Sequence, residues 1–175
     1  MKREQRGASL LESLVVVATV AVLAAAAPAG LHTWAAGQRL QGLAAQLETE
    51  LQHARALAVA RNEPVRVGLP EDRGGRCVVL YSGPSGACGC QPDLTPICQP
   101  DGRLLRAVEI DRRLSVRQIG NARQFTFSGV HGTVTPTATL ELRHQGDRAM
   151  RLVVNLMGRV RACAVGAAWS GHPPC

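Results

Sequence analysis

The sequence has 175 residues, a formal net charge of +7, and a composition that is 46% hydrophobic but only 3% aromatic. If roughly the first fifty residues form one helix, the remainder has room for one globular domain, which excludes a multidomain protein. The core must be aliphatic. Because Lys2 is the only lysine, the basic surface must be built from arginine, whose planar fork of donors suits phosphate. The base content of the genome would explain an Ala-, Gly-, Arg- and Pro-rich composition equally well.

A short basic leader, Met1 to Gly7, precedes a long apolar run in which Thr19 is the only polar side chain between Leu14 and Ala27. An ordinary secretory signal peptide has its apolar core first and its small-residue cleavage site afterwards. Here the order is reversed, because the small residue Gly7 lies before the apolar core. Cleavage at that point would leave the apolar core in the mature protein.

These residues resemble the prepilin N-terminus of type IV pilins and pseudopilins. In that family a prepilin peptidase cleaves after a glycine, the new N-terminus is methylated, and a glutamate is the fifth residue of the mature chain. Gly7, Ala8 and Glu12 match these positions. The resemblance implies that Glu12, which is costly in hydrocarbon unless it is paired, meets the N-terminal amine of a neighbouring subunit. A plain N-terminal membrane anchor is the alternative interpretation.

The apolar run predicts a long helix that continues beyond it. We expect residues 8–29 to form a half that crosses the inner membrane or lies in a filament core, and residues 30–62 to form an amphipathic half. Pro28 with Gly30 should kink or locally unwind the helix. The helix should end at about residue 61 or 62, because Pro64 disfavours helix at the residue before it. The amphipathic half repeats apolar residues at spacings of three and four, at Leu40, Leu43, Leu47, Leu51, Ala54 and Ala58.

Residues 63–175 consist of strand-like and turn-like segments, and we expect them to form a β-rich globular head. The segment 82–102 is rich in Gly, Pro and Cys, has almost no periodicity, and is expected to be a long loop. Residues 145–147 indicate a hairpin turn, and the tail 167–175 should be irregular. Strands are expected at 65–69, 77–81, 104–110, 114–119, 124–127, 137–143, 150–155 and 159–165. A long N-terminal helix packed on an antiparallel sheet is an α+β fold.

A series of short blocks in the head is similar to the FimT/GspH branch of the pilins. The blocks are Phe125-Thr126-Phe127, Gly132, Thr139-Leu140-Glu141-Leu142, Arg151-Leu152-Val153-Val154 and Gly158-Arg159-Val160-Arg161. The resemblance implies the pilin-like fold, in which a long N-terminal helix packs on an antiparallel sheet. The Cys-rich segment is not an expected feature of this branch.

Six cysteines follow the apolar segment. The N-terminal signal places them outside the cytoplasm, where paired cysteines form disulfides by default. We expect Cys163 to pair with Cys175 and pin the tail to the last strand, because the tail turns back through Gly171 and Pro173. The remaining cysteines should pair among themselves, namely Cys77, Cys88, Cys90 and Cys98. A metal site using the last three of these is an alternative, although the paired-knuckle spacing of zinc sites is missing.

No catalytic constellation stands out in the sequence. Its five histidines are scattered, and it has no nucleophile elbow, no phosphate-binding loop and no paired-histidine metal motif. We therefore expect a protein that is not an enzyme and that needs no cofactor and no metal.

The best candidate for a binding site is the motif Gly158-Arg159-Val160-Arg161. Residues two apart in a strand share a face, so Arg159 and Arg161 should project together, ~6.6 Å apart, with Val160 on the other face. Two neighbouring arginine forks can hold successive phosphates without reading bases. Gly158 would start the strand with a turn or allow close approach of another backbone segment.

Arg148 and Arg151 would widen this basic patch, since no acid follows Arg148 in the sequence. In the FimT group, a Gly-Arg-x-Arg motif near the C-terminus is associated with DNA binding during natural transformation. The resemblance therefore implies that Gly158, Arg159 and Arg161 contact DNA. An exposed arginine pair on a solvated strand face, without any ligand, is the structural alternative.

Two functional hypotheses from different classes follow. The first is a minor type IV pilin that binds double-stranded DNA without sequence preference and supports DNA uptake. The second is a GspH-like minor pseudopilin, a structural part of a type II secretion filament. Both place a single-pass protein in the bacterial inner membrane, with its head in the periplasm, before it joins a filament of other pilins or pseudopilins.

Overall fold

The computed structural model describes residues 10–26, 28–69, 76–120, 123–144, 149–166 and 171–175. The chain divides into two compact units, Met1–Ala36 and Gly37–Cys175. The expected cleavage site at Gly7 and Ala8 lies outside the described residues. The turn expected at 145–147 lies outside them as well.

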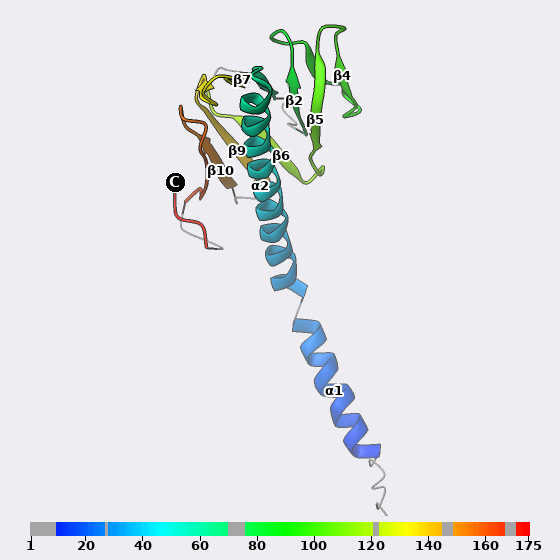
Figure 1. The fold of residues 1–175 in the computed structure, drawn as a ribbon. Coiled ribbons are helices and arrows are strands. Elements are labelled where there is room, and N and C mark those ends of the chain that lie inside the picture. Colours follow the sequence, from blue (N-terminus) through cyan, green and yellow to red (C-terminus); the bar gives the residue numbers. More distant parts are fainter. Residues whose placement is uncertain (1–9, 27, 70–75, 121–122, 145–148, 167–170) are drawn as a thin grey trace, which may run out of the picture. The chain divides into compact units, whose positions relative to one another are not determined.

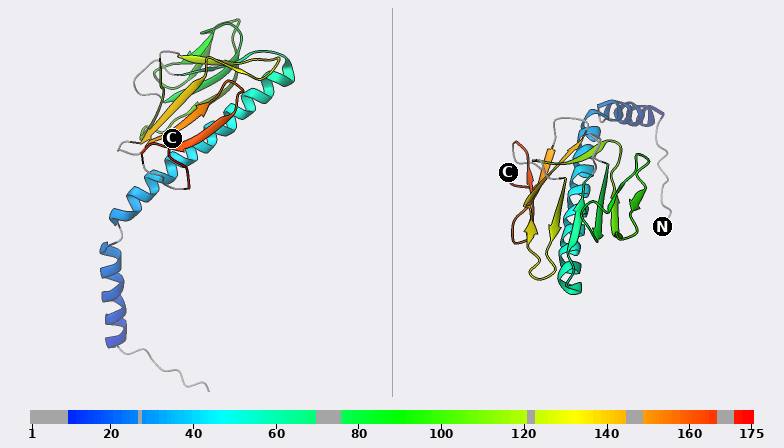
Figure 2. Two further views of the ribbon diagram at one scale, coloured as in Figure 1. Left: turned by 90° about the vertical axis from the view of Figure 1, so that its left-hand side faces the viewer. Right: turned by 90° about the horizontal axis from the view of Figure 1, so that it is seen from above.

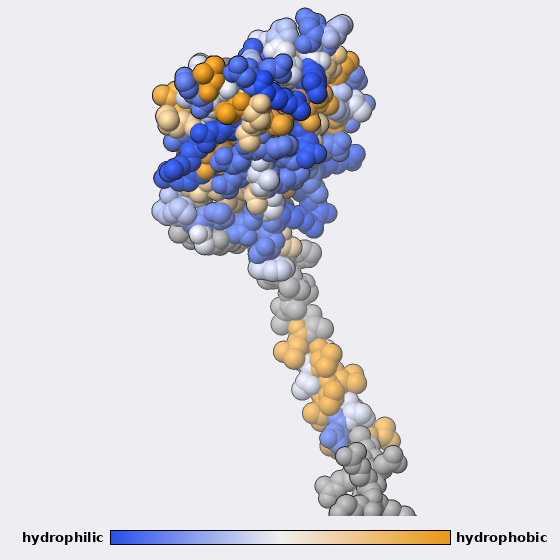
Figure 3. Space-filling view, in the orientation of Figure 1, coloured by the Kyte–Doolittle hydropathy of each residue, from blue (hydrophilic) through white to orange (hydrophobic). Residues whose placement is uncertain are grey.

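The first unit contains helix α1 (Leu10–Ala26). Its large apolar side chains are exposed, from 53% at Val15 to 88% at Leu10, and Figure 3 shows apolar residues along this helix. The hydroxyls of Ser13 and Thr19 donate to backbone carbonyls one turn earlier, which satisfies these donors within the helix. In the part of the chain that the structure describes, no helix is both long enough and apolar enough to cross a membrane.

Helix α2 (Pro28–Arg61) starts directly after the undescribed residue 27. Proline suits the first position of a helix, because its missing N–H would have no helical partner there. The helix ends at Arg61, as expected, with Asn62 in the left-handed region at φ 52°. Glu63 N–H donates to the Ala58 carbonyl at 3.1 Å, and Asn62 N–H donates to the Val59 carbonyl at 3.2 Å. These two bonds form a Schellman cap, so the backbone itself stops the helix.

Two antiparallel sheets accompany α2 in the second unit (Figure 1). The larger sheet has the strand order β5-β2-β1-β7-β8. Its strands are β1 (Val65–Gly68), β2 (Cys77–Ser82), β5 (Arg103–Glu109), β7 (Gln124–Phe127) and β8 (Val134–Thr135). The smaller sheet has the order β11-β10-β9-β6. Its strands are β6 (Leu114–Gln118), β9 (Ala138–His144), β10 (Ala149–Val154) and β11 (Val160–Ala164).

One hydrophobic core joins α2 to both sheets. The leucine and alanine face predicted for the helix is buried throughout, with Leu40, Leu47 and Leu51 fully inaccessible. It packs in the same cluster as side chains of both sheets, including Phe125 of β7 and Leu140 of β9. Figure 2 shows the green strands on one side of α2 and the yellow and orange strands on the other. The head is therefore the expected α+β arrangement, with the helix as the shared support.

The segment 82–102 is not the irregular loop that we expected. It contains β3 (Cys88–Cys90) and β4 (Pro96–Cys98), which pair antiparallel with Cys88 opposite Cys98. Disulfides link Cys88 to Cys98 and Cys77 to Cys90. Strands of three residues are too short to show a periodicity in the sequence, and the covalent links supply the stability that a large apolar face would otherwise give.

The third disulfide joins Cys163 to Cys175, so the expected pairing is confirmed. The tail follows β11 at its free edge, where Ala164 N–H donates to the Pro173 carbonyl at 2.8 Å. Cys175 N–H donates in turn to the Ala164 carbonyl at 3.0 Å. The tail thereby pairs with backbone groups at the end of an edge strand.

Candidate nucleic-acid interface

The Gly-Arg-x-Arg motif lies at the hairpin between β10 and β11. Val154 pairs with Val160, and the five residues between them form the turn. Gly158 N–H donates to the Asn155 carbonyl at 2.9 Å, and Arg159 N–H donates to the Asn155 Oδ1 atom at 2.9 Å. Gly158 has φ 73°, a conformation that glycine adopts without the strain of a Cβ atom. These hydrogen bonds and the conformation of Gly158 hold the backbone of the turn at Arg159.

The hairpin packs closely at Gly158 against Arg55 of α2 and against Gly132, which lies between β7 and β8. The Arg55 Nε–H donates to the Gly132 carbonyl at 3.1 Å. A Cβ atom added to Gly158 would collide with that same carbonyl oxygen and would lie 2.9 Å from Arg55 Cδ. Gly158 therefore has both features considered for it, a turn conformation and a close approach of neighbouring chain. No sequence pattern singles out Arg55, because its contact with Gly132 joins residues that are far apart in the chain.

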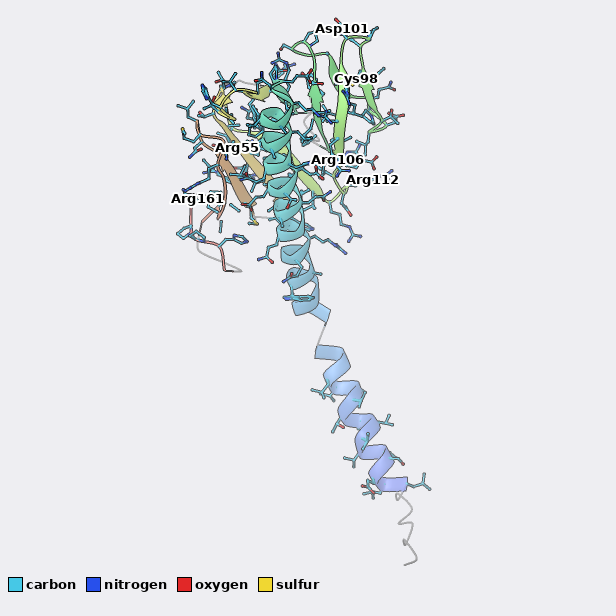
Figure 4. The ribbon with its side chains drawn as sticks, viewed as in Figure 1. Arg55, Cys98, Asp101, Arg106, Arg112 and Arg161 are labelled. Carbon is cyan, nitrogen blue, oxygen red and sulfur yellow. A yellow bond between two sulfur atoms is a disulfide. The ribbon has the colours of Figure 1, made fainter. Side chains whose placement is uncertain are left out.

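Arg159 and Arg161 are both exposed, while Val160 and Ala162 pack on the hydrophobic core. Arg159 belongs to the turn and Arg161 to β11, which begins at Val160. Figure 4 shows Arg161 beside β10, on the opposite side of α2 from Arg106. Within the described residues, neither arginine forms an ion pair with an acid. Both guanidinium groups are therefore available to an external anion.

Arg151 lies on the same sheet, but its guanidinium group is hydrogen-bonded to an acid. Its Nε and Nη2 atoms donate to Glu141 Oε2 at 3.1 and 3.0 Å, and its side chain is 35% exposed. Arg151 was expected to widen the basic patch, but it is paired with this buried acid, whose side chain is only 1% exposed. Arg148, the other residue expected to widen the patch, lies outside the described residues.

Glu141 also accepts hydrogen bonds from two further arginines. Arg117 Nη2 lies 2.6 Å and Arg143 Nε lies 2.7 Å from Glu141 Oε1. Glu141 of β9 is directly opposite Arg117 of β6 and Arg151 of β10 in the sheet register. Directly opposite residues of antiparallel strands share a face, and Arg143 lies two residues further along β9 on that face. We call Glu141 with these three arginines the Glu141 cluster.

The electrostatics of the cluster follow from its geometry. Burial alone would raise the pKa of the Glu141 carboxyl, but the hydrogen bonds from Arg143, Arg117 and Arg151 outweigh burial and lower that pKa from 4.5 to about 2. Glu141 is therefore ionised at neutral pH. One negative charge balances only one of the three positive charges, so the cluster carries an excess of two positive charges.

No metal site competes with this surface in the described residues. They hold no group of three or more His, Cys, Asp or Glu side chains that would bind a metal ion. All six cysteines are in disulfides. What the site offers chemically is a set of guanidinium donors for anions.

The comparisons with known proteins identify the fold and the family. The structure is similar to crystal structures of the type IV minor pilin FimU from Pseudomonas aeruginosa strain PAO1. One has a TM-score of 0.55 at 19% sequence identity, covering 74% of this chain and 100% of that chain. Another crystal form has a TM-score of 0.52 at 22% identity, covering 71% and 87%. The minor pseudopilin EpsH from Vibrio cholerae has a TM-score of 0.49 at 17% identity, covering 72% and 97%. The comparison with curated proteins gives no match.

The long helix, the shared core and the two antiparallel sheets define a pilin-like protein, and the likeness to FimU confirms this fold. Residues 43–158 match the family described as "Type II transport protein GspH", so the chain belongs to the GspH family of minor pilins and pseudopilins. The matched region ends at Gly158. Arg159 and Arg161 thus lie just beyond the part of the chain that the family match covers.

Proposed function

We propose that this protein is a minor type IV pilin that binds double-stranded DNA through the β10–β11 hairpin and supports DNA uptake in natural transformation. The observation that carries the proposal is the pair of exposed arginines, Arg159 and Arg161, on a hairpin that packs closely at Gly158 against Arg55 of α2 and Gly132. Arginine forks that contact phosphates give affinity without base recognition. The described site has no element for reading bases, so binding is independent of sequence.

The N-terminus gives this protein its place in a filament. The exposed apolar side chains of α1 are suited to the inner membrane before assembly and to the packed interior of a filament of pilins afterwards. Prepilin peptidase cleaves between Gly7 and Ala8, and mass spectrometry of the mature protein tests this. Glu12 acts in assembly, so Glu12→Ala should leave the head folded but lower its incorporation into filaments.

DNA binding is tested on the purified full chain in a non-ionic detergent, by titrating labelled duplex DNA at several salt concentrations. Each phosphate contact contributes about 0.9 to the slope of log affinity against log salt. Arg159→Gln combined with Arg161→Gln should therefore flatten the slope by about 1.8 and remove most binding at low salt. The melting temperature should hardly change, because exposed charges contribute little to stability.

The matched control is Arg103→Gln combined with Arg106→Gln, an equal loss of charge from exposed residues of β5 in the other sheet. If the control weakens binding as much as the hairpin variant, the effect is one of bulk charge and the hairpin is not a site. If the wild-type protein shows no salt-sensitive binding, the DNA-binding proposal is wrong.

The second candidate function is that of a GspH-like minor pseudopilin in a type II secretion filament. It is favoured by the family description, which names type II transport. This function requires the same α1 and head but no free arginine hairpin. The hairpin variant should then leave secretion unchanged, whereas Glu12→Ala should impair it. The position of the gene beside pilus genes or within a secretion operon also separates the two candidates.

A further inference from the structure

A second basic surface lies on the outer face of the four-stranded sheet, around the Glu141 cluster. Its arginines come from three strands, Arg117 from β6, Arg143 from β9 and Arg151 from β10. None of these strands is the β11 strand that carries Arg161. The side chains of Arg117 and Arg143 are 63% and 50% exposed, although each donates to the buried Glu141 carboxylate.

The inner edges of these guanidinium groups are fixed, and the outer edges are open to solvent. Arg143 donates through Nε, and Arg117 donates through Nε and Nη2, to the same oxygen of Glu141. A guanidinium has five N–H donors, so each keeps donors that point away from the carboxylate. A fork held in place by a buried partner loses less conformational freedom when it binds an anion, which favours binding.

The charge of the cluster is suited to an anionic partner and does not depend on pH in the physiological range. Because the pKa of Glu141 is lowered to about 2, the carboxylate stays charged and its hydrogen bonds stay in place. The excess of two positive charges is therefore permanent. If the cluster served only to neutralise charge, it would contain as many acids as arginines. A purely structural role for Glu141 would need fewer than the three arginines that surround it.

The cluster lies on the same face of the sheet as Arg161 of the β10–β11 hairpin. Arg151 is opposite Cys163, and Arg161 lies two residues before Cys163 on the same face of the sheet. Four strands spaced at about 4.8 Å extend across about 14 Å. Duplex DNA carries one charge per about 1.7 Å of its axis, so a surface of this width faces several phosphates at once.

We propose that the Glu141 cluster is a second phosphate-contacting site, at which Arg117 and Arg143 bind the DNA backbone while Glu141 and Arg151 position them. Duplex DNA then lies across the four strands, from the hairpin at β11 to β6. The proposal rests on the proposed DNA-binding function and extends its footprint to residues that the Gly-Arg-x-Arg motif does not include.

The test uses the full chain in detergent and the same duplex titration over a range of salt concentrations. Arg117→Gln combined with Arg143→Gln leaves Arg151 on Glu141, so the buried carboxylate keeps a partner. This variant should flatten the salt slope by about 1.8 and weaken binding at low salt by on the order of tenfold or more. Arg117→Lys combined with Arg143→Lys should keep the slope, because it keeps both charges. Arg143→Gln alone, should the double variant fail to fold, should flatten the slope by about 0.9.

The outcomes separate this inference from the proposed function. If the loss of affinity in the Arg117/Arg143 variant adds to the loss in the Arg159/Arg161 variant, the result supports two contact regions on one face. A sheet variant with wild-type slope, beside a hairpin variant with a flattened slope, overturns the second site and leaves the hairpin site standing. A sheet variant that binds DNA normally but no longer enters filaments assigns the face to an acidic neighbouring subunit and overturns the inference. No binding by the wild-type protein overturns both proposals.

Discussion

The two large sheets of the head share one core and one helix, yet they use their arginines differently. Residues 63–110, which supply most of the five-stranded sheet, contain five arginines and six acids, whereas residues 111–175 contain nine arginines and three acids. In the first region, Arg106 pairs with Glu50 at 3.3 Å, and Arg66 donates to the Gly83 carbonyl at 2.7 Å. In the second region, three arginines share Glu141, and Arg159 and Arg161 have no acidic partner among the described residues.

This difference separates the requirements of folding from those of binding. Both sheets bury their inner faces against α2 with aliphatic side chains, to which the five-stranded sheet adds two phenylalanines, and neither needs an excess of charge to do so. Like charges gathered on one face repel each other, and evolution would be expected to disperse them if they had no partner. The excess of positive charge on the four-stranded sheet therefore favours an anionic partner. The five-stranded sheet, on the same helix, is the reference against which this excess is judged.

The largest expected effect comes from removing the buried acid. Glu141→Ala leaves three arginines facing one another without their carboxylate, and it should lower the free energy of unfolding by about 4 kcal/mol. Glu50→Ala, in the partly exposed pair with Arg106, should cost less, about 1 kcal/mol. Denaturant unfolding monitored by circular dichroism measures both. Equal and small effects would mean that the Glu141 cluster does not stabilise the sheet.

Acid should weaken the four-stranded sheet in a defined pH window. The pKa of Glu141 is about 2 in the folded chain, against 4.5 ordinarily. A carboxyl whose pKa is lowered by folding adds stability above its unfolded pKa and loses it as the pH falls. With 1.36 kcal/mol per pKa unit, about 3 kcal/mol should disappear between pH ~5 and pH ~2.

The matched variant is Glu141→Gln, which has no carboxyl to titrate at this position. Its stability should be lower than that of the wild type at pH 7 and should lack this component of the acid dependence. Melting temperatures measured at half-unit steps of pH test this. A variant that loses as much stability as the wild type over the same window would show that other carboxyls cause the acid dependence.

Much of the fold could be predicted because local patterns determine it. The apolar spacing from Leu40 to Ala58 identified the buried face of α2, and alternation identified most strands to within one or two residues. The short strands β3, β4 and β8 were missed, because two or three residues show no periodicity. Disulfides and pairing to neighbouring strands, and not local propensity, define these elements.

The candidate site was only partly predictable. Arg159 and Arg161 are recognisable because they lie in one short motif. The pair of Glu141 and Arg151 was available in principle, since both lie five residues from Gly146 in the expected hairpin turn. Arg117 reaches Glu141 through the pairing of β6 with β9, which are distant in the sequence, and no local pattern reports such a pairing. A cluster assembled by long-range register is visible only in the structure.

The disulfide at the edge of the four-stranded sheet should have the next largest effect. Cys163→Ser combined with Cys175→Ser releases the tail from β11, and closing a loop of this size stabilises a protein by somewhat less than 3 kcal/mol on the chain-entropy model. DNA binding should persist if the tail only protects the edge. Unfolding curves and duplex titrations of the same variant separate these roles, and loss of binding in a folded variant would assign the tail to the interface.

The smallest expected effect, and the one that tests the chemistry of the hairpin most closely, comes from exchanging arginine for lysine. Arg159→Lys combined with Arg161→Lys keeps two positive charges but replaces planar forks with flexible ammonium groups. Because counterion release depends on the number of phosphates neutralised, the salt slope should stay that of the wild type. Affinity should nevertheless fall by a few-fold, since the bidentate contacts are lost. Titrations at several salt concentrations give the slope and the affinity together.

A lysine variant with wild-type affinity would mean that charge alone acts at the hairpin. A flattened slope would mean that the substitution moved the side chains away from the phosphates. The same exchange at Arg103 and Arg106 of β5 should change neither quantity, because the five-stranded sheet does not face the DNA.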